Sequence, residues 1–279
     1  MAKQTAARAH DFTRIDVHTH SWPFEDATKI KGSAAAYVKK IRAAGIDKVV
    51  LMAPADCCLK AVKKYGDFVI PVAMYYMREF GRRDFRGEME RALDGGCKAI
   101  KFIAPLAPYS DERYWPLYDM IDHRGAVAMF HTGYLGFDEK QPEIPPIEMT
   151  HMRAAHIDAI GRRFPRLKIE MSHFSNPWWE EAWKVAWSRP NVYADLSGGT
   201  AINRAISMWA EMFAPHGVLM ESALKKVCFA SDVNYFHDGD HDFGAHIDFH
   251  ERLLDRINAP AELRELVWSG NARKLFGLK

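Results

Sequence analysis

The chain of 279 residues is 48% hydrophobic and carries a formal net charge of +2, a size and composition that allow one large domain with an extensive core. Its Lys and Arg residues are scattered, so the charge pattern gives no footprint for nucleic-acid binding. No apolar run approaches the roughly 20 residues that cross a bilayer, and Met1 to Thr13 contains no apolar segment typical of a secretory signal. We expect a cytoplasmic protein with a flexible tail over residues 1–13 and one domain over residues 14–279.

Short apolar segments rich in β-branched residues alternate with longer stretches of helical periodicity. The predicted strands are Arg14–His18, Lys48–Met52, Phe68–Ala73, Ala99–Ile103, Val127–Phe130, Leu167–Met171, Val192–Ala194 and Lys226–Ala230. The predicted helices are Ser33–Ala44, Asp84–Leu93, Tyr114–His123, Met149–Arg163, Trp178–Trp187, Ala245–Ile257 and Ala261–Val267. Such alternation predicts a parallel sheet with helices outside. Eight strands in this length favour an α/β fold of the (β/α)8 or TIM-barrel type over a doubly wound sheet, because no Gly-rich phosphate-binding segment follows a strand.

The first predicted strand runs into His18-Thr19-His20. Residues two apart in an extended strand point to the same side, so the two imidazoles aim at one point. Imidazole is a good ligand for zinc and similar metals. The pattern is weak on its own, because two histidines so spaced are more often exposed or satisfied polar residues.

Histidines and a carboxylate also follow other predicted strands. His131 follows the fifth strand, His173 the sixth and Asp232 the eighth, while Lys101 lies in the fourth. Each alone has an ordinary explanation as a hydrogen-bonded buried histidine, a helix cap or a lysine that reaches the barrel end. Because a TIM barrel gathers its active site at the carboxyl ends of its strands, their shared position predicts one site. Imidazoles with one carboxylate would hold a divalent ion and leave a position open.

These strand ends resemble the amidohydrolase superfamily, and in particular its amidohydrolase-2 branch. The motifs that carry the resemblance are His-x-His after the first strand, His131-Thr132-Gly133, Ser172-His173 and Ser231-Asp232, with Asn191–Gly198 and the closing Ser269–Leu278. The resemblance extends from Ile15 to Leu278 in the expected order. The branch contains metal-dependent hydrolases, decarboxylases such as aminocarboxymuconate-semialdehyde decarboxylase, and lactonases that use no metal.

The resemblance implies that His18, His20, His131 and Asp232 bind one divalent metal ion, for which we expect zinc, with manganese as the alternative. It also implies that His173 is not a tight ligand but orients water or contacts the substrate. Asp232 would act as the catalytic base and then protonate the leaving group, while His173 would polarise the carbonyl or stabilise the oxyanion.

The lysine of the fourth strand has two interpretations. In binuclear members of the superfamily a lysine on this strand is carbamylated and bridges two metals, and Lys101 occupies a comparable strand, although the neighbouring Lys98 makes the alignment less certain. We favour a free Lys101 amine that binds a substrate carboxylate or carbonyl. Arg78, after the third strand, would hold an anionic substrate group with it.

The leading hypothesis is therefore a metal-dependent hydrolase that acts on a small carboxylate-bearing ester, lactone or amide. The alternative is non-oxidative decarboxylation of a small aromatic or unsaturated acid, with Asp232 or His173 delivering a proton to carbon. A third hypothesis is a non-catalytic metal-binding barrel. The expected partner is a small-molecule substrate, and a homodimer is compatible with the family.

Three further features have structural interpretations. The Pro-rich insert Gln141–Pro146 shapes the site entrance or forms a stiff surface loop, and the His- and Asp-rich segment Phe236–Phe243 is interpreted as a solvated loop rather than a second metal site. His246 and His250 are expected on the surface of the following helix. The four cysteines show no metal-site spacing and are predicted to be reduced and mostly buried: Cys57, Cys58, Cys97 and Cys228.

Overall fold

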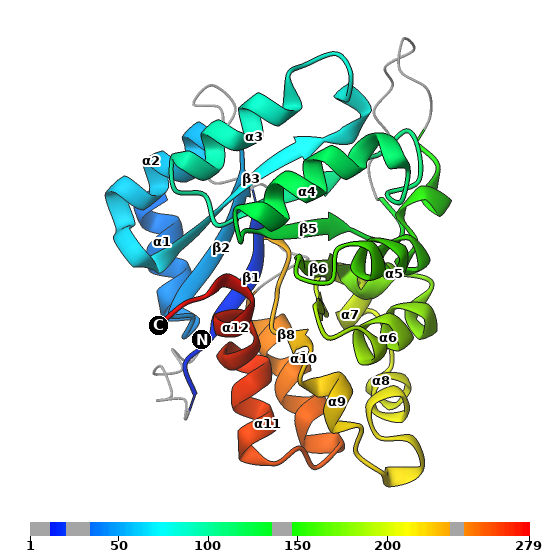
Figure 1. Cartoon of the computed structure of the whole chain (residues 1–279). Coiled ribbons are helices and arrows are strands. Elements are labelled where there is room, and N and C mark those ends of the chain that lie inside the picture. The colour runs from blue at the N-terminus through cyan, green and yellow to red at the C-terminus, as the bar shows by residue number, and fades with distance from the viewer. Residues whose placement is uncertain (1–11, 21–33, 136–146, 235–242) are drawn as a thin grey trace.

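The computed structural model describes residues 12–20, 34–135, 147–234 and 243–279. Its strands form one parallel sheet in the order β8-β7-β6-β5-β4-β3-β2-β1-β9 (Figure 1). The strands are β1 (Ile15–His20), β2 (Lys48–Ala53), β3 (Val69–Tyr76), β4 (Ala99–Ile103), β5 (Val127–His131), β6 (Lys168–Ser172), β7 (Val192–Asp195), β8 (Val227–Cys228) and β9 (Val233–Asn234). The predicted (β/α)8 barrel is confirmed.

Helices cover the outside of the sheet (Figure 1). The α-helices of the described residues are α1 (Ala34–Ala43), α2 (Ala55–Tyr65), α3 (Phe85–Asp94), α4 (Trp115–His123), α5 (Ala154–Arg163), α6 (Trp179–Ser188), α7 (Gly198–Ile202), α8 (Ile206–Phe213), α9 (Glu221–Leu224), α10 (Phe243–Arg256), α11 (Ala261–Glu265) and α12 (Asn271–Phe276). Short helical turns are η1 (Gly66–Phe68), η2 (Met77–Glu79), η3 (Glu112–Tyr114), η4 (Met149–Met152), η5 (His173–Ser175), η6 (Pro215–Gly217) and the π-turn η7 (Leu266–Gly270).

The eighth strand of the barrel is broken into two pieces. β8 pairs with β7, and β9 pairs with β1. Between the two pieces, the Phe229 carbonyl accepts a hydrogen bond from the Val17 amide at 3.1 Å, and the Asp232 amide donates to the His18 carbonyl at 2.9 Å. These bonds join β1 to the eighth strand and close the barrel, and they bring Asp232 beside the first strand.

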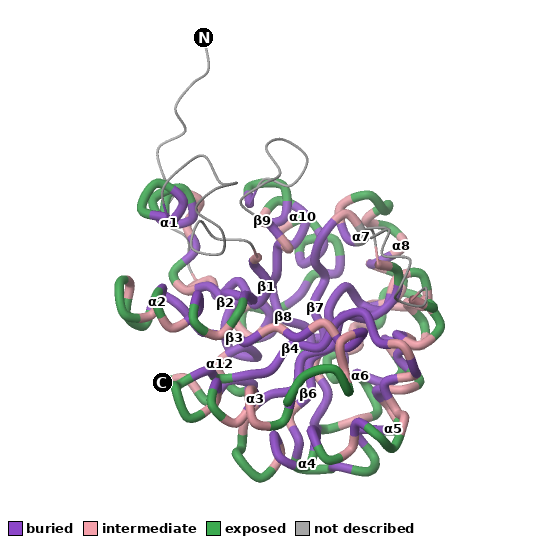
Figure 2. The backbone as a smooth tube through the Cα atoms, turned by 90° about the horizontal axis from the view of Figure 1, so that it is seen from above, coloured by how far each residue is buried: buried purple, intermediate pink, exposed green. Residues whose placement is uncertain are grey.

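The core has two apolar layers, one inside the barrel and one between the strands and the helices, and the strands are buried along most of their length (Figure 2). The inner layer contains Ile15, Val17 and Val50 with their neighbours, and it continues into Leu275 and Phe276 of α12. Because apolar side chains fill this part of the interior, polar side chains face inward mainly near the carboxyl ends of the strands.

Several predicted boundaries are wrong for physical reasons. The predicted helix from residue 149 is interrupted at Arg153, whose extended backbone (φ −73°, ψ 149°) separates η4 from α5. The predicted eighth strand is shorter because the Phe229 amide donates to the Val267 carbonyl instead of a neighbouring strand. The final predicted helix ends at Glu265 and continues as the π-turn η7. Helix α2 was not predicted, although Cys57, Cys58 and Ala61 form its buried face.

The expectation that His246 and His250 lie on the surface is also wrong. Both are buried, because the apolar face of α10 packs towards the barrel and the two histidines are one turn apart on that face. The ring of His250 contacts Phe229 and Trp268, with centroids 5.0 and 5.8 Å away. All four cysteines are free and buried, as predicted.

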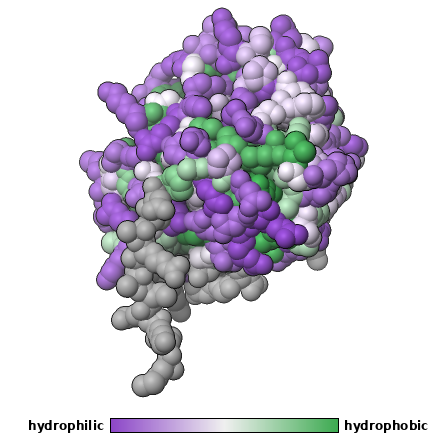
Figure 3. All heavy atoms as spheres, turned by 90° about the horizontal axis from the view of Figure 1, so that it is seen from below, coloured by the Kyte–Doolittle hydropathy of each residue, from purple (hydrophilic) through white to green (hydrophobic). Residues whose placement is uncertain are grey.

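The tail over residues 1–11, the insert Gln141–Pro146 and residues 236–242 of the His- and Asp-rich segment lie outside the described residues. Within the described part of the chain, no helix combines the length and the apolar character that a membrane span requires. Seen from below, the surface is largely hydrophilic, with apolar side chains gathered in a central strip (Figure 3).

Candidate metal centre and active site

The end of β1 contains a β-bulge, which sets the direction of the His18 and His20 side chains. Asp16 pairs with Val49 of β2, but Thr19 pairs with Leu51, so β1 holds one extra residue between these positions. Asp16 stabilises the bulge: its Oδ1 accepts hydrogen bonds from the amides of His18 and Ser231, both at 3.0 Å. Burial raises the pKa of Asp16 to about 7, against the opposing effect of these hydrogen bonds.

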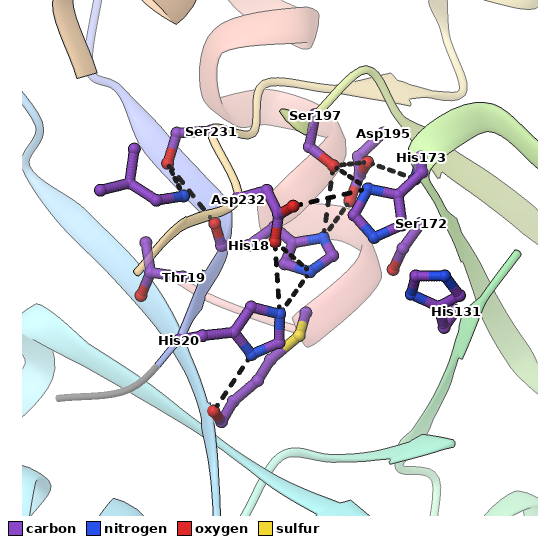
Figure 4. Close-up of polar contacts among 12 residues, drawn as sticks. His18, Thr19, His20, His131, Ser172, His173, Asp195, Ser197, Ser231 and Asp232 are labelled. Carbon is purple, nitrogen blue, oxygen red and sulfur yellow. Dashed lines mark hydrogen bonds and ion pairs between the residues drawn. The ribbon is translucent and has the colours of Figure 1, made fainter. Parts of the chain in front are cut away.

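Three ligand atoms from β1 and from the end of the eighth strand converge (Figure 4). Nε2 of His18 lies 2.8 Å from Nε2 of His20, and Oδ1 of Asp232 lies 3.3 and 3.4 Å from these two nitrogens. The His18 side chain is fully buried, whereas the side chains of His20 and Asp232 are 19% and 29% exposed. The cluster is therefore open to solvent on the side of His20 and Asp232.

The hydrogen bonds around the two rings show that this cluster suits a cation. Nδ1 of His18 faces a carboxylate oxygen of Asp195 at 2.8 Å, and Nδ1 of His20 faces the Met52 carbonyl at 3.4 Å. Only an N–H group satisfies these acceptors, so both protons of the neutral rings lie on Nδ1. Both Nε2 lone pairs then face each other beside a carboxylate oxygen. Three electron-rich atoms so close repel one another unless a cation lies between them.

The separations also fit a metal. Atoms bound about 2.1 Å from one zinc ion lie about 3.4 Å apart at the tetrahedral angle, which matches the two distances from Asp232. The 2.8 Å between His18 and His20 is close to the roughly 3.0 Å of ligands at a right angle, as in octahedral coordination. The donor set therefore fits either zinc or manganese.

Asp195, at the end of β7, fixes two of the histidines and was not assigned a role from the sequence. Its Oδ2 accepts from Nδ1 of His18, and its Oδ1 accepts from the His173 amide at 2.8 Å and from the Ser197 hydroxyl at 2.6 Å. A carboxylate that binds the outer nitrogen of a metal-ligating imidazole fixes its tautomer and orientation. The sequence pattern that could have indicated this role is Asp195-x-Ser197, because it lies at the end of a strand next to the strands that carry the histidines.

Ser197 sets the tautomer of His173. Its single hydroxyl proton is donated to Asp195, so its oxygen accepts from Nδ1–H of His173 at 2.9 Å. In the neutral ring, Nε2 of His173 is then a hydrogen-bond acceptor. This geometry favours an acceptor role for His173 over the predicted stabilisation of an oxyanion, for which the ring must first be protonated.

The turn that carries His173 is strained. His173, Phe174 and Ser175 have consecutive positive φ values of 64°, 48° and 54°, a conformation that costs of order 1–3 kcal/mol for each non-glycine residue. The surrounding backbone approaches closely, since a Cβ at Gly133 would lie 2.1 Å from the Asn176 carbonyl oxygen. Packing of the neighbouring backbone thus holds the turn in this conformation, which places His173 at the end of the barrel.

His131 lies beside the convergent cluster rather than in it. Its ring packs against that of His173 with centroids 4.6 Å apart, and its Nε2 faces the Tyr134 carbonyl at 3.1 Å. Neither group of ligand atoms found among the described residues includes His131. The structure therefore brings together three of the four predicted ligands and leaves His131 as a neighbour.

The second group of ligand atoms, on His18, His173 and Asp195, is buried. The hydroxyl of Ser197 lies among its atoms and bonds to Asp195 and His173. We interpret this group as the hydrogen-bonded support of the first cluster, because its nitrogens already donate to oxygen acceptors.

The two predicted substrate-binding cations have different environments. Lys101 is fully buried in β4, and its Nζ donates to the hydroxyl of Ser172. Burial lowers the pKa of Lys101, although nearby carboxylates act in the opposite direction. Arg78 is buried in η2, just after β3, with its guanidinium 5.0 Å from the ring centroid of Tyr76.

Burial keeps His18, His131 and His173 neutral. It lowers the pKa of His18 and His173 well below the ordinary value and that of His131 to about 3, and the positive charge of Lys101 acts in the same direction. Neutral imidazole is the form that binds metals. The site is thus prepared to bind a divalent ion at neutral pH.

The fold and the site define a (β/α)8 barrel with a candidate metal centre at the carboxyl ends of its strands. A model of the amidohydrolase family matches residues 15–278, and the chain belongs to this family. A curated relative, L-fucono-1,5-lactonase from Burkholderia ambifaria, is 33% identical over 135 residues, which are 41% of this chain and 43% of the lactonase. The chain therefore matches less than half of that relative.

Solved structures share the fold at low sequence identity. The 5-carboxyvanillate decarboxylase LigW from Sphingomonas paucimobilis has a TM-score of 0.69 and 12% identity, over 96% of this chain and all of that chain. The 5-carboxyvanillate decarboxylase from Novosphingobium aromaticivorans, solved with manganese and 4-hydroxy-3-methoxy-5-nitrobenzoic acid, has a TM-score of 0.63 and 16% identity, over 96% and 97% of the two chains. At these identities the likeness establishes the barrel alone.

Proposed function

We propose that the protein is a metal-dependent hydrolase that opens a neutral, hydroxyl-bearing lactone. The observation that carries the proposal is the convergence of His18 Nε2, His20 Nε2 and Asp232 Oδ1 on one solvent-accessible point. A divalent ion held there would lower the pKa of water from about 15.7 towards 7 and polarise a carbonyl. The curated lactonase relative supports the lactone class.

The residues around this point can carry the proton transfers. Oδ2 of Asp232 lies 3.9 Å from Nδ1 of His173, and a Cβ at Gly198 would lie only 2.8 Å from that oxygen, so glycine leaves room for the carboxylate. Asp232 accepts the proton of the attacking water and returns it to the alkoxide released when the ring C–O bond breaks. The product is the open hydroxy acid, and Nε2 of His173 accepts a hydrogen bond from a substrate hydroxyl.

The charges near the site support a neutral substrate rather than the carboxylate-bearing one expected from the sequence. Lys101 is fully buried and bound to Ser172. Arg153, near the ends of β5 and β6, forms a 2.7 Å ion pair with Glu181. Because these cations have partners within the protein, they are less available to a substrate carboxylate.

Decarboxylation of a small aromatic acid is the second candidate. Arg78, at the end of β3 and beside the Tyr76 ring, is the cation that favours it, since a guanidinium can bind a carboxylate. Two relatives of known structure are named as decarboxylases. In this reaction Asp232 would deliver a proton to the carbon that loses carbon dioxide.

The two reactions give different products. We would incubate the protein, loaded with zinc or manganese, with sugar-derived 1,5-lactones and separately with 5-carboxyvanillate, and follow acid release and carbon dioxide. We expect lactone opening without carbon dioxide, and a decrease in kcat of about 100-fold or more in Asp232→Asn. The exposed Asp248→Asn is the control that keeps wild-type rates. Carbon dioxide release without lactone opening would select the second candidate.

A further inference from the structure

Glu170 is a buried carboxyl group that the predicted site does not use. It lies in the middle of β6, paired with Met129 of β5 and Tyr193 of β7, and is 0% exposed. An ionised carboxylate at such a position is strongly unfavourable unless its charge is compensated. The hydrogen-bond partners of its two oxygens therefore determine whether Glu170 is ionised or neutral.

One oxygen of Glu170 has a donor and the other has none. Oε2 accepts from the Ser172 hydroxyl at 2.8 Å. This uses the only hydroxyl proton of Ser172, whose oxygen accepts from Nζ of Lys101 in turn. Among the described residues, no N–H or O–H group donates to Oε1 of Glu170.

Asp195 follows two residues after Tyr193, the β7 partner of Glu170, so the side chains of Asp195 and Glu170 lie on the same face of the sheet. Two carboxylates form a hydrogen bond only when one of them carries a proton. Asp195 accepts three donors, from His18, His173 and Ser197, so both of its oxygens already serve as acceptors. Burial, followed by the charge of Asp195, raises the pKa of Glu170 well above its ordinary value. The proton therefore belongs on Glu170.

We propose that Glu170 is a positioning residue: as a neutral acid it donates a hydrogen bond to Asp195 and thereby fixes the carboxylate that orients His18 towards the metal. The charges near Lys101 agree with a neutral Glu170. With the proton on Glu170, the single positive charge of Lys101 is matched by one ionised carboxylate, Asp195, rather than by two. The resulting hydrogen-bonded chain runs from Lys101 through Ser172, Glu170 and Asp195 to His18 and joins β4, β6, β7 and β1.

The inference rests on the metal centre of the proposed function but not on which reaction that centre performs. Glu170→Gln keeps a neutral donor for Asp195 and an acceptor for Ser172, whereas Glu170→Met removes both. We would measure zinc and manganese dissociation constants of the metal-depleted protein by titration. We expect Glu170→Gln to stay within about threefold of wild type and Glu170→Met to bind at least about tenfold more weakly, as for other groups that support metal ligands. The exposed Glu180→Gln is the matched control.

Infrared spectroscopy tests the proton itself, in folded protein and without metal. We expect one protonated-carboxyl band of the wild type to be lost in Glu170→Gln and kept in Glu180→Gln, whereas the band of Asp16, whose pKa is about 7, is kept in both variants. Identical spectra of wild type and Glu170→Gln would overturn the proposal, as would an affinity in Glu170→Gln as low as in Glu170→Met. Wild-type affinity in a folded Glu170→Met would show that the group positions nothing. If no variant and no wild type binds metal, the proposed function fails, while the infrared result still decides the protonation.

Discussion

Replacing Asp195 by asparagine should weaken metal binding by changing a tautomer while leaving the shape of the side chain almost intact. Oδ1 of Asp195 accepts two donors, from the His173 amide and the Ser197 hydroxyl, so the asparagine oxygen will take that side. Its NH2 group then faces Nδ1 of His18, where the carboxylate accepted at 2.8 Å. The neutral ring must now accept at Nδ1 and carry its proton on Nε2, where a metal would bind.

The size of the effect follows from the number of ligands involved. Only one of the three convergent atoms, Nε2 of His18, is affected. Loss of a carboxylate behind a metal-ligating histidine typically costs 10- to 100-fold in metal affinity, which is about 1.4–2.8 kcal/mol. We expect a decrease within this range for Asp195→Asn, with little change in the unfolding temperature of the metal-free protein.

The assay is titration of metal-depleted protein with zinc or manganese, with Asp119→Asn as control because that side chain is 59% exposed on α4. Nuclear magnetic resonance of the imidazole nitrogens of His18 reports the tautomer directly. Metal affinity within twofold of wild type, together with a changed tautomer, would refute the reasoning. It would show that His18 does not bind the metal through Nε2.

Three further predictions concern other parts of the molecule. His20→Ala should lose more metal affinity than His131→Ala, since Nε2 of His131 faces a backbone carbonyl; an equal loss in titrations would make His131 a ligand. Gly133→Ala should lower the free energy of unfolding by at least about 2 kcal/mol, because its Cβ would meet Asn176 at 2.1 Å and its φ is +86°; unchanged urea unfolding would contradict this. Burial lowers the pKa of His250 in the folded protein to about 4. As the pH falls, the unfolded chain therefore binds a proton at this histidine at a higher pH than the folded protein does. The stability contribution of His250 is complete above about pH 6.5 and decreases by about 3 kcal/mol as pH falls to about 4. His250→Gln should remove that part of the pH dependence, and a wild-type pH profile in the variant would contradict the assignment.

Local patterns in the sequence predict the barrel well, because each of the first seven strands carries its own apolar, β-branched signal. The break in the eighth strand cannot be predicted from the residues of that strand alone. Its break depends on Asp16, which binds the amide of Ser231 from 215 positions away. The buried position of His250 was missed for a related reason: the apolar face of α10 is defined by contacts with Phe229 and Trp268, which lie on other elements.

The candidate site was predictable as a set of strand ends but not as a network. His18, His20 and Asp232 follow from their positions after parallel strands, and the structure brings them together. The roles of Asp195 and Ser197 depend on which of their neighbours donates and which accepts. Sequence spacing does not contain that information, so it predicts the ligand types but not their tautomers.

The broken eighth strand leaves few paired positions where the barrel closes. β3 and β4 share five paired positions, whereas β7 shares two with β8, and β1 shares two with β9. The candidate centre therefore lies on the least cross-linked seam of the barrel, where transient separation breaks few backbone hydrogen bonds. Amide protons of residues 227–234 should exchange with deuterium faster than those of β3 and β4, and bound metal should slow them. A metal bound by His18 and His20 of β1 and by Asp232 of the eighth strand would then join the two sides of this seam and oppose its opening.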